Sequence, residues 1–163
     1  MGAYKPSPEE VAEAESSFEK DAPDAGAVAP AIEATTLDGK PLTLEQFKGK
    51  FVLLDFWATW CGPCIKEIPA LQAVHEEFGD DERLAMVSLS VDEKIDEPRQ
   101  FQSKRQLPWT QGFLGGGIHG PTLGRFGIRA IPAFVLVGPD GRIVARGMRG
   151  EAIKKAVAEA MEK

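Results

Sequence analysis

The sequence predicts an α/β fold in which a mixed central β-sheet is flanked by helices and extended by a β-hairpin on its N-terminal side. Three observations support this prediction. Residues 51–58 form a near-continuous apolar run, which is typical of a strand buried on both faces of a sheet. Apolar residues then recur at helical spacing from Ile68 to Phe78. Further on, the turn sequence at 138–141 separates two short apolar runs, as in an antiparallel hairpin.

The composition is that of an ordinary soluble globular protein. The chain has 163 residues, enough for one domain with a sizeable core, and 43% of them are hydrophobic and 27% charged. The net charge of −6 argues against nucleic acid as the main partner, because that role needs a basic face. No apolar run is long enough for a membrane span, and residues 1–50 show no signal-peptide core. We expect a monomer.

The N-terminal segment differs from the rest of the chain. Residues 1–29 are rich in Ala, Pro, Glu and Asp. A capping-box start at Ser7, followed by apolar residues at helical spacing, predicts a short amphipathic helix over 8–19 with a linker after it. A disordered arm or the end of a tether fits this composition equally well. We therefore divide the chain into a helix and linker or tail, 1–29, and a folded domain, 30–163.

The remaining elements follow from the alternation of apolar runs and turn signals. The predicted strands span 51–57, 84–91, 109–114, 133–137 and 142–146, with two more within 32–44 on either side of an Asp-Gly turn. The predicted helices span 44–47, 96–106, 121–126 and 151–161, together with a long helix that follows the first core strand and ends at Gly79. Because proline cannot donate a backbone hydrogen bond, we expect Pro69 to kink the long helix. We interpret glycines 115–117 as a flexible loop.

The two cysteines of the chain, Cys61 and Cys64, lie where the core strand passes into the long helix. Cys61 is expected at or just before the first helical turn, where free backbone N–H groups and the helix dipole favour a thiolate. Cys64 lies one turn deeper, close enough to close a small disulfide ring, and faces the protein interior. Pro63 fits a first turn that needs no donor there, and it stiffens the ring. The spacing predicts a reversible dithiol–disulfide pair.

Other roles for the cysteines have less support. A bridge that encloses two residues restricts the unfolded chain little, so stabilisation is a poor explanation. A zinc site needs two further ligands, and neither His75 nor His119 has finger-like spacing to the pair. We therefore predict no metal, and no cofactor besides the redox-active Cys61-Cys64 disulfide.

Two carboxylates accompany the pair. Asp55 is the one charged residue in the core strand and lies six residues before Cys61. Burying an ionised carboxylate is unfavourable, so we expect Asp55 to be protonated, bridged to water or paired, and a purely structural aspartate is the alternative. Glu67 follows Cys64 by three residues and shares nearly the same helical face, although an ordinary solvated acid would give the same pattern.

The motif WCGPC, preceded by DFWAT, resembles the active-site signature of the thioredoxin superfamily. The continuation KEIPAL and the upstream segment APAIEATTLDGKPLTLEQFKGK are similar to TlpA/ResA-like thiol-disulfide oxidoreductases, as is the extra segment between the second core strand and Pro132. This resemblance implies a thioredoxin-like fold over residues 30–163. It also implies a thiol-disulfide oxidoreductase that acts as a reductant of protein disulfides.

The resemblance implies roles for individual residues. Cys61 would attack a substrate disulfide and Cys64 would resolve the mixed disulfide, while Asp55 would accept and return the proton of Cys64. Glu67 would tune the thiols or assist proton transfer. The chain departs from the pattern in two places, since ResA-like chains commonly carry Asn in place of Asp55, and Ser88 replaces a lysine usual in thioredoxins. The residues expected to contact the substrate are Trp60, Gly62, Pro63, Ile131 and Pro132, with the Ile131-Pro132 bond in the cis form.

The implied partners are disulfide-containing protein substrates and an upstream reductase that donates electrons. The resemblance implies an extracytoplasmic location, periplasmic or membrane-tethered, with the cytoplasm as the alternative. A thioredoxin-fold peroxidase is a rival function, although its reactive cysteine follows a Thr-x-x-Cys pattern that Thr59 does not fit. A copper-binding or redox-sensing module is a second rival, which would favour a longer cysteine spacing and a histidine ligand.

Overall fold

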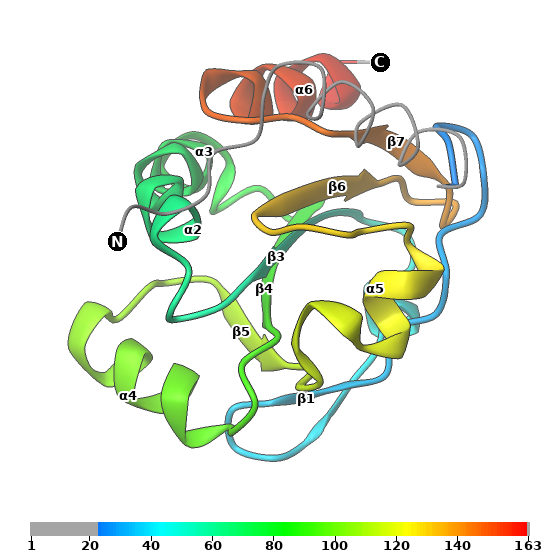
Figure 1. The fold of residues 1–163 in the computed structure, drawn as a ribbon. Helices are drawn as coiled ribbons and strands as arrows, with labels where there is room; N and C mark the ends of the chain where they lie inside the picture. Colours follow the sequence, from blue (N-terminus) through cyan, green and yellow to red (C-terminus); the bar gives the residue numbers. More distant parts are fainter. Residues whose placement is uncertain (1–22, 163) are drawn as a thin grey trace, which may run out of the picture.

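The computed structural model describes residues 23–162 and contains the predicted mixed sheet with helices on both faces (Figure 1). The sheet has seven strands in the order β2-β1-β5-β4-β3-β6-β7. The helix predicted over 8–19 lies outside the described residues. Among residues 23–162, no helix combines the length and the apolar content that crossing a bilayer requires.

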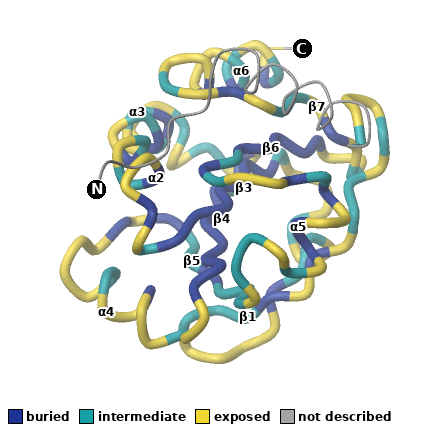
Figure 2. The backbone as a smooth tube through the Cα atoms, in the orientation of Figure 1, coloured by how far each residue is buried: buried dark blue, intermediate teal, exposed yellow. Residues whose placement is uncertain are grey.

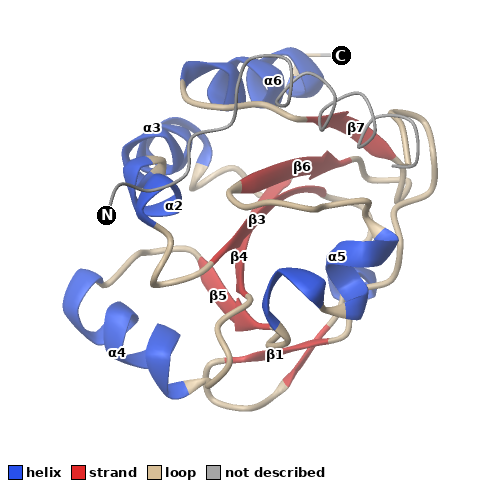
Figure 3. Cartoon of the chain, viewed as in Figure 1, coloured by secondary structure: helices blue, strands red, loops and turns tan. Residues whose placement is uncertain are grey.

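Most predicted elements are confirmed to within one residue, and Figure 3 shows their placement. The strands are β1 (Ala34–Thr36), β2 (Pro41–Leu42), β3 (Phe51–Trp57), β4 (Leu84–Ser90), β5 (Thr110–Phe113), β6 (Ala133–Val137) and β7 (Ile143–Arg146). The α-helices are α2 (Gly62–Lys66), α3 (Ile68–Phe78), α4 (Asp96–Arg105), α5 (Pro121–Arg125) and α6 (Glu151–Met161), and two short 3₁₀ helices are η1 (Leu44–Phe47) and η2 (Gly117–His119).

Strand β3 is the centre of the sheet because its apolar run is buried on both faces. It pairs in parallel with β4 and antiparallel with β6. Side chains alternate along a strand, so Leu53 packs toward α3 and α6, while Val52, Leu54 and Phe56 pack toward α5. Figure 1 shows α3 and α6 on one side of the sheet and α5 on the other. In Figure 2 the buried residues accordingly concentrate along β3, β4 and β6.

The prediction of one long helix after β3 is wrong, because α2 and α3 are separate helices that meet at Glu67. This residue ends α2 and precedes α3, and its carbonyl accepts the amide of Leu71 at 3.2 Å. Pro69 lies in the first turn of α3, where no backbone donor is needed. The expected kink is therefore a break just before Pro69, which separates the short helix carrying the cysteines from the long helix that packs on the core.

The first described residues run beside the β6–β7 hairpin. The amide of Gly26 donates to the carbonyl of Ile143 at 2.7 Å, and that of Ala29 donates to Gly141 at 2.9 Å. The part of the expected linker that lies within the described residues is thus paired with the hairpin. The division of the chain at residue 30 stays a prediction.

Candidate active site

Cys61 and Cys64 form a disulfide at the junction between β3 and α2. Their Cα atoms are 5.3 Å apart. Cys61 is the N-terminal cap of α2: its backbone is extended, and its sulfur accepts the amide hydrogen of Cys64 at 3.2 Å. An amide that points at this sulfur stabilises negative charge on it, so the local backbone favours a thiolate at Cys61 when the pair is reduced.

The surface around the disulfide is formed by its neighbours in the motif. Trp60 is 62% exposed, and Gly62 and Pro63 are exposed as well. The cysteines themselves are buried: Cys61 is 5% exposed and Cys64 is 4% exposed. Exposure therefore does not distinguish the two sulfurs in the oxidised protein, whereas their positions do, because Cys61 is the cap of α2 and Cys64 lies within that helix.

The loop before β6 reaches the cysteine pair. The carbonyl oxygen of Ile131 lies 3.9 Å from the sulfur of Cys61, and the Ile131-Pro132 peptide bond is cis. Ile131 is half-buried and Pro132 is buried. Tertiary structure thus brings Ile131 to Cys61, the neighbour of Trp60 and Gly62 in the chain.

Asp55 is buried in the middle of the sheet and accepts a 2.7 Å hydrogen bond from the hydroxyl of Ser88. Burial raises the pKa of Asp55 from 3.8 to about 7, while the Ser88 hydrogen bond lowers it and the negative charge of Glu67 raises it. A carboxyl group with a pKa near neutrality can both accept and return a proton under physiological conditions. Asp55 therefore has a pKa in the range that a proton-transfer group requires.

Glu67 connects the cysteine-bearing helix to the C-terminal helix. Its carboxylate accepts the amide hydrogen of Gly150, the residue that caps α6, at 2.9 Å. Its charge also raises the pKa of Asp55. The side chain is half-buried, so the solvated surface acid that sequence left open does not describe it. Glu67 combines a structural contact with an electrostatic effect on the site.

Asp92 was not among the predicted site residues, yet it holds the loop that leads to Cys61. It is fully buried just beyond β4, and its carboxylate accepts the Thr59 amide at 3.1 and 3.2 Å and the Thr59 hydroxyl at 2.7 Å. The Ser90 hydroxyl donates to it at 2.6 Å. Because β3 and β4 are parallel, both strands end at this edge of the sheet. The signal in the sequence was an acid directly after an apolar strand.

We expect Asp92→Ala to lower the free energy of unfolding by about 3 kcal/mol, because the donors of half-buried Thr59 and buried Ser90 would lose their acceptor. Urea denaturation of the oxidised protein measures this loss. Glu93→Ala is the matched control: the neighbouring acid is exposed, so its change should stay within about 0.5 kcal/mol. A loss within about 0.5 kcal/mol in Asp92→Ala as well would show that the contacts of Asp92 do not stabilise the fold.

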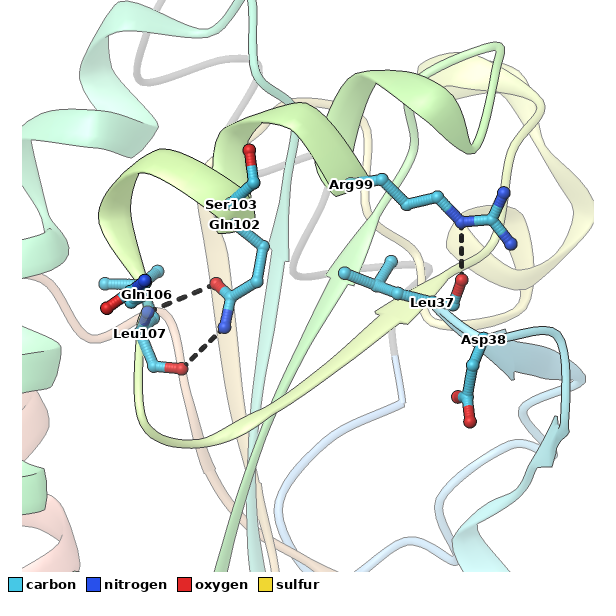
Figure 4. Close-up of a pocket in the computed structure, with 7 residues that line it drawn as sticks. All are labelled: Leu37, Asp38, Arg99, Gln102, Ser103, Gln106 and Leu107. Carbon is cyan, nitrogen blue, oxygen red and sulfur yellow. Dashed lines mark hydrogen bonds between the residues drawn. The ribbon is translucent and has the colours of Figure 1, made fainter.

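Some side-chain groups lie apart from this site. An open hollow between α4 and the β1–β2 turn is lined by Leu37, Asp38, Arg99, Gln102, Ser103, Gln106 and Leu107 (Figure 4). Arg99 donates to the carbonyl of Leu37, and Gln102 bonds the backbone of Leu107, so these side chains tie the helix to its surroundings. Within residues 23–162, no three His, Cys, Asp or Glu side chains gather so that they could hold a metal ion.

The mixed sheet, its flanking helices and the CxxC disulfide at a strand-to-helix junction define a thioredoxin-like redox protein. Residues 25–146 match the AhpC/TSA family. The chain belongs to this family.

The similar proteins belong to the class that the fold and the disulfide define. The thiol-disulfide oxidoreductase ResA of Bacillus thuringiensis subsp. konkukian is 30% identical over 138 residues, which is 85% of this chain and 77% of that protein. A thiol-disulfide oxidoreductase from Bacteroides fragilis is 28% identical with a TM-score of 0.76, over 82% of this chain and 98% of that one. A thiol:disulfide interchange protein from Bacteroides sp. is 31% identical with a TM-score of 0.78, over 86% of this chain and 92% of that one. The chain is a thiol-disulfide oxidoreductase of the thioredoxin-like, TlpA/ResA-like kind.

Proposed function

We propose that this oxidoreductase reduces disulfide bonds in protein substrates, with Cys61 as nucleophile and Cys64 as resolving thiol. The observation that carries the proposal is the position of Cys61 at the cap of α2, where the Cys64 amide points at its sulfur. That arrangement favours the thiolate that attacks a disulfide.

The first step forms a mixed disulfide. The Cys61 thiolate attacks one sulfur of the substrate disulfide, the substrate S–S bond breaks, and the other substrate sulfur leaves as a thiolate. In this proposal the substrate chain lies against the protein beside the Ile131 carbonyl, whose oxygen is 3.9 Å from the Cys61 sulfur. Trp60, Gly62, Pro63 and Pro132 complete the docking surface in this proposal.

The second step releases the reduced substrate. Asp55 takes the proton of Cys64, whose thiolate then attacks the Cys61 sulfur and displaces the second substrate thiolate. The substrate has gained two electrons and takes up protons, one of them returned by Asp55, and the protein is left with the Cys61–Cys64 disulfide. Glu67 supports this step by raising the pKa of Asp55, which makes the carboxylate a stronger base.

The proposed cycle needs a second protein as a partner. An upstream reductase supplies two electrons to the Cys61–Cys64 disulfide after each turnover, and no further cofactor is required. We propose that the protein lies outside the cytoplasm, on the basis of its likeness to ResA, and that it is a monomer. A cytoplasmic location is the alternative.

The test is capture of substrates by Cys64→Ser, which can form a mixed disulfide but cannot resolve it. The variant is incubated with extracytoplasmic and cytoplasmic fractions, and captured proteins are identified after release with dithiothreitol. We expect disulfide-bearing proteins to be captured mainly from the extracytoplasmic fraction. A redox-buffer titration of the wild-type protein accompanies the capture. The proposal is wrong if Cys61 and Cys64 do not interconvert between dithiol and disulfide, or if no protein is captured.

A peroxide-reducing role is the second candidate, because the AhpC/TSA family match fits a thioredoxin-fold peroxidase as well. Thr59 does not have the Thr-x-x-Cys spacing to either cysteine, which favours the disulfide reductase. Consumption of hydrogen peroxide by the reduced protein, at a rate that exceeds its reaction with protein disulfides, would favour the peroxidase instead.

A further inference from the structure

A chain of hydrogen bonds runs through the sheet to Asp55. The indole N–H of Trp109 donates to the oxygen of Ser88 at 2.8 Å, and the hydroxyl of Ser88 donates to Asp55 Oδ2 at 2.7 Å. All three residues are buried, with exposed fractions of 8%, 2% and 7% for Trp109, Ser88 and Asp55. The register imposes this chain, because Ser88 lies opposite Asp55 in the β3–β4 ladder and Trp109 directly precedes β5, the other neighbour of β4.

The hydrogen-bonding capacity of the three groups fixes the direction of the chain. An indole N–H can only donate, and a serine hydroxyl carries one hydrogen. Because Trp109 donates to Ser88, the hydrogen of Ser88 is directed at Asp55 Oδ2, which accepts it. When Asp55 is protonated, its proton therefore resides on Oδ1, the oxygen that Ser88 does not occupy. A polarised hydroxyl is also a stronger donor, which stabilises the carboxylate.

We propose that Trp109 and Ser88 are positioning residues of thiol–disulfide exchange, which hold Asp55 as the acceptor of the Cys64 proton. The inference rests on the proposed role of Asp55. Burial and Glu67 both raise the pKa of Asp55, and the Ser88 hydrogen bond is the interaction that opposes them. Without the indole donor, the Ser88 hydroxyl can turn and accept a hydrogen bond from neutral Asp55. Neutral Asp55 is then stabilised, and the ionised fraction of Asp55 at neutral pH falls.

The groups on the neighbouring elements could also affect the titration of Asp55. Glu67 acts on Asp55 from the α2–α3 junction, and Cys64 does not titrate while it is in the disulfide. From β6, the residue opposite Asp55 is Phe134, which carries no charge. From α3, the ring of His75 lies 5.9 Å from that of Trp109. The test therefore uses the oxidised protein for titration, and the comparison is repeated in the His75→Gln background, so that this ring cannot cause the difference.

The experiment compares Trp109→Phe, which keeps an aromatic ring and removes the donor, with the wild-type protein. The ¹³C chemical shift of the Asp55 carboxyl group is followed from pH 4 to 9 in the oxidised form. We expect the midpoint of its titration to move to higher pH, so that the ionised fraction at pH 6 falls by about two- to tenfold. The release of an aromatic thiol from a mixed disulfide on Cys61 should slow by the same factor at pH 6 and recover at high pH.

Trp57→Phe is the matched control, because the indole N–H of Trp57 is also buried but has no hydrogen-bond partner among the described residues. The midpoint of the Asp55 titration should not change in Trp57→Phe. Ser88→Ala should reproduce the effect of Trp109→Phe, and the double variant should match Ser88→Ala alone, since Trp109 acts through Ser88.

Two results separate this inference from the proposed function. An unmoved Asp55 midpoint in Trp109→Phe, or an additional shift in the double variant, overturns the hydrogen-bond chain whatever the activity. A midpoint that moves while thiol release keeps its rate and pH profile shows that Asp55 is not the base for Cys64. That result overturns the positioning role together with the proposed function of Asp55.

Discussion

Cys61→Ser will lose disulfide reduction by more than about a thousandfold, because a serine hydroxyl at this position is not ionised and cannot attack a disulfide. The cap of α2 directs the Cys64 amide at the sulfur of Cys61, so the stabilised thiolate belongs to this residue. The rate is measured as thiol release from a small protein disulfide with dithiothreitol as the electron source, which removes dependence on the physiological reductase.

Cys64→Ser is the control for this prediction, since it removes the other sulfur and keeps the nucleophile. It should form a stable mixed disulfide at a rate close to that of the wild-type protein, and turnover should stop there. Cys61→Ser should form none. If both variants trapped a substrate equally well, the assignment of Cys61 as nucleophile would be wrong, because either sulfur could then begin the reaction despite its position.

Asp55→Asn will slow resolution of the mixed disulfide by about a hundredfold at pH 7, which is the usual contribution of a single proton-transfer group. The asparagine keeps the shape of the side chain and an oxygen that accepts the Ser88 hydrogen, but it cannot take up the proton of Cys64. Resolution is followed as thiol release from a mixed disulfide on Cys61. The step that forms the mixed disulfide should be affected much less.

The same substitution will change how stability depends on pH. Asp55 has a pKa of about 7 in the folded protein and 3.8 in the unfolded chain, so between these values the folded state binds more protons. Its contribution to stability is present at low pH and is lost as the pH rises toward 7 and beyond. From pH 5 to pH 8 this loss amounts to about 2.5 kcal/mol in the wild-type protein.

Asp55→Asn removes that dependence, so the variant should gain stability relative to the wild-type protein as the pH rises. Urea unfolding of the oxidised proteins at pH 5 and pH 8 measures the difference without titration of the thiols. Asp96→Asn is the control, because Asp96 is an exposed acid of α4. It should leave the rate of mixed-disulfide resolution and the pH dependence of stability as in the wild-type protein. A stability difference between Asp55→Asn and wild type that is constant with pH would refute the elevated pKa.

Local patterns in the sequence were enough to predict most elements of the fold. The apolar run of β3 and the turn at 138–141 mark their elements because burial and turn geometry each leave a short, readable signal. The prediction of one long helix was wrong, because α2 ends and α3 begins at Glu67. A proline inside an apolar helical pattern fits both a kink and the first turn of a new helix, and the packing of α3 against the core favours the second.

The sequence predicted the cysteine pair of the candidate site but not the long-range contacts around it, for a similar reason. Cys61 and Cys64 are three residues apart, so their joint chemistry follows from spacing alone. The contact of Glu67 could not be predicted from spacing, since its hydrogen-bond partner Gly150 is 83 residues away in the chain. Asp92 likewise acts on Thr59 across 33 residues.

Local spacing and apolar periodicity in the sequence are enough to place the two sulfurs together at the end of a buried strand. The groups around Asp55 become visible in the folded protein alone, since Ser88 and Trp109 reach Asp55 through the register of three neighbouring strands. Hydrogen bonds between residues far apart in the chain depend on which strands pair, and for strands that no short turn connects, the sequence of one strand does not identify its partner.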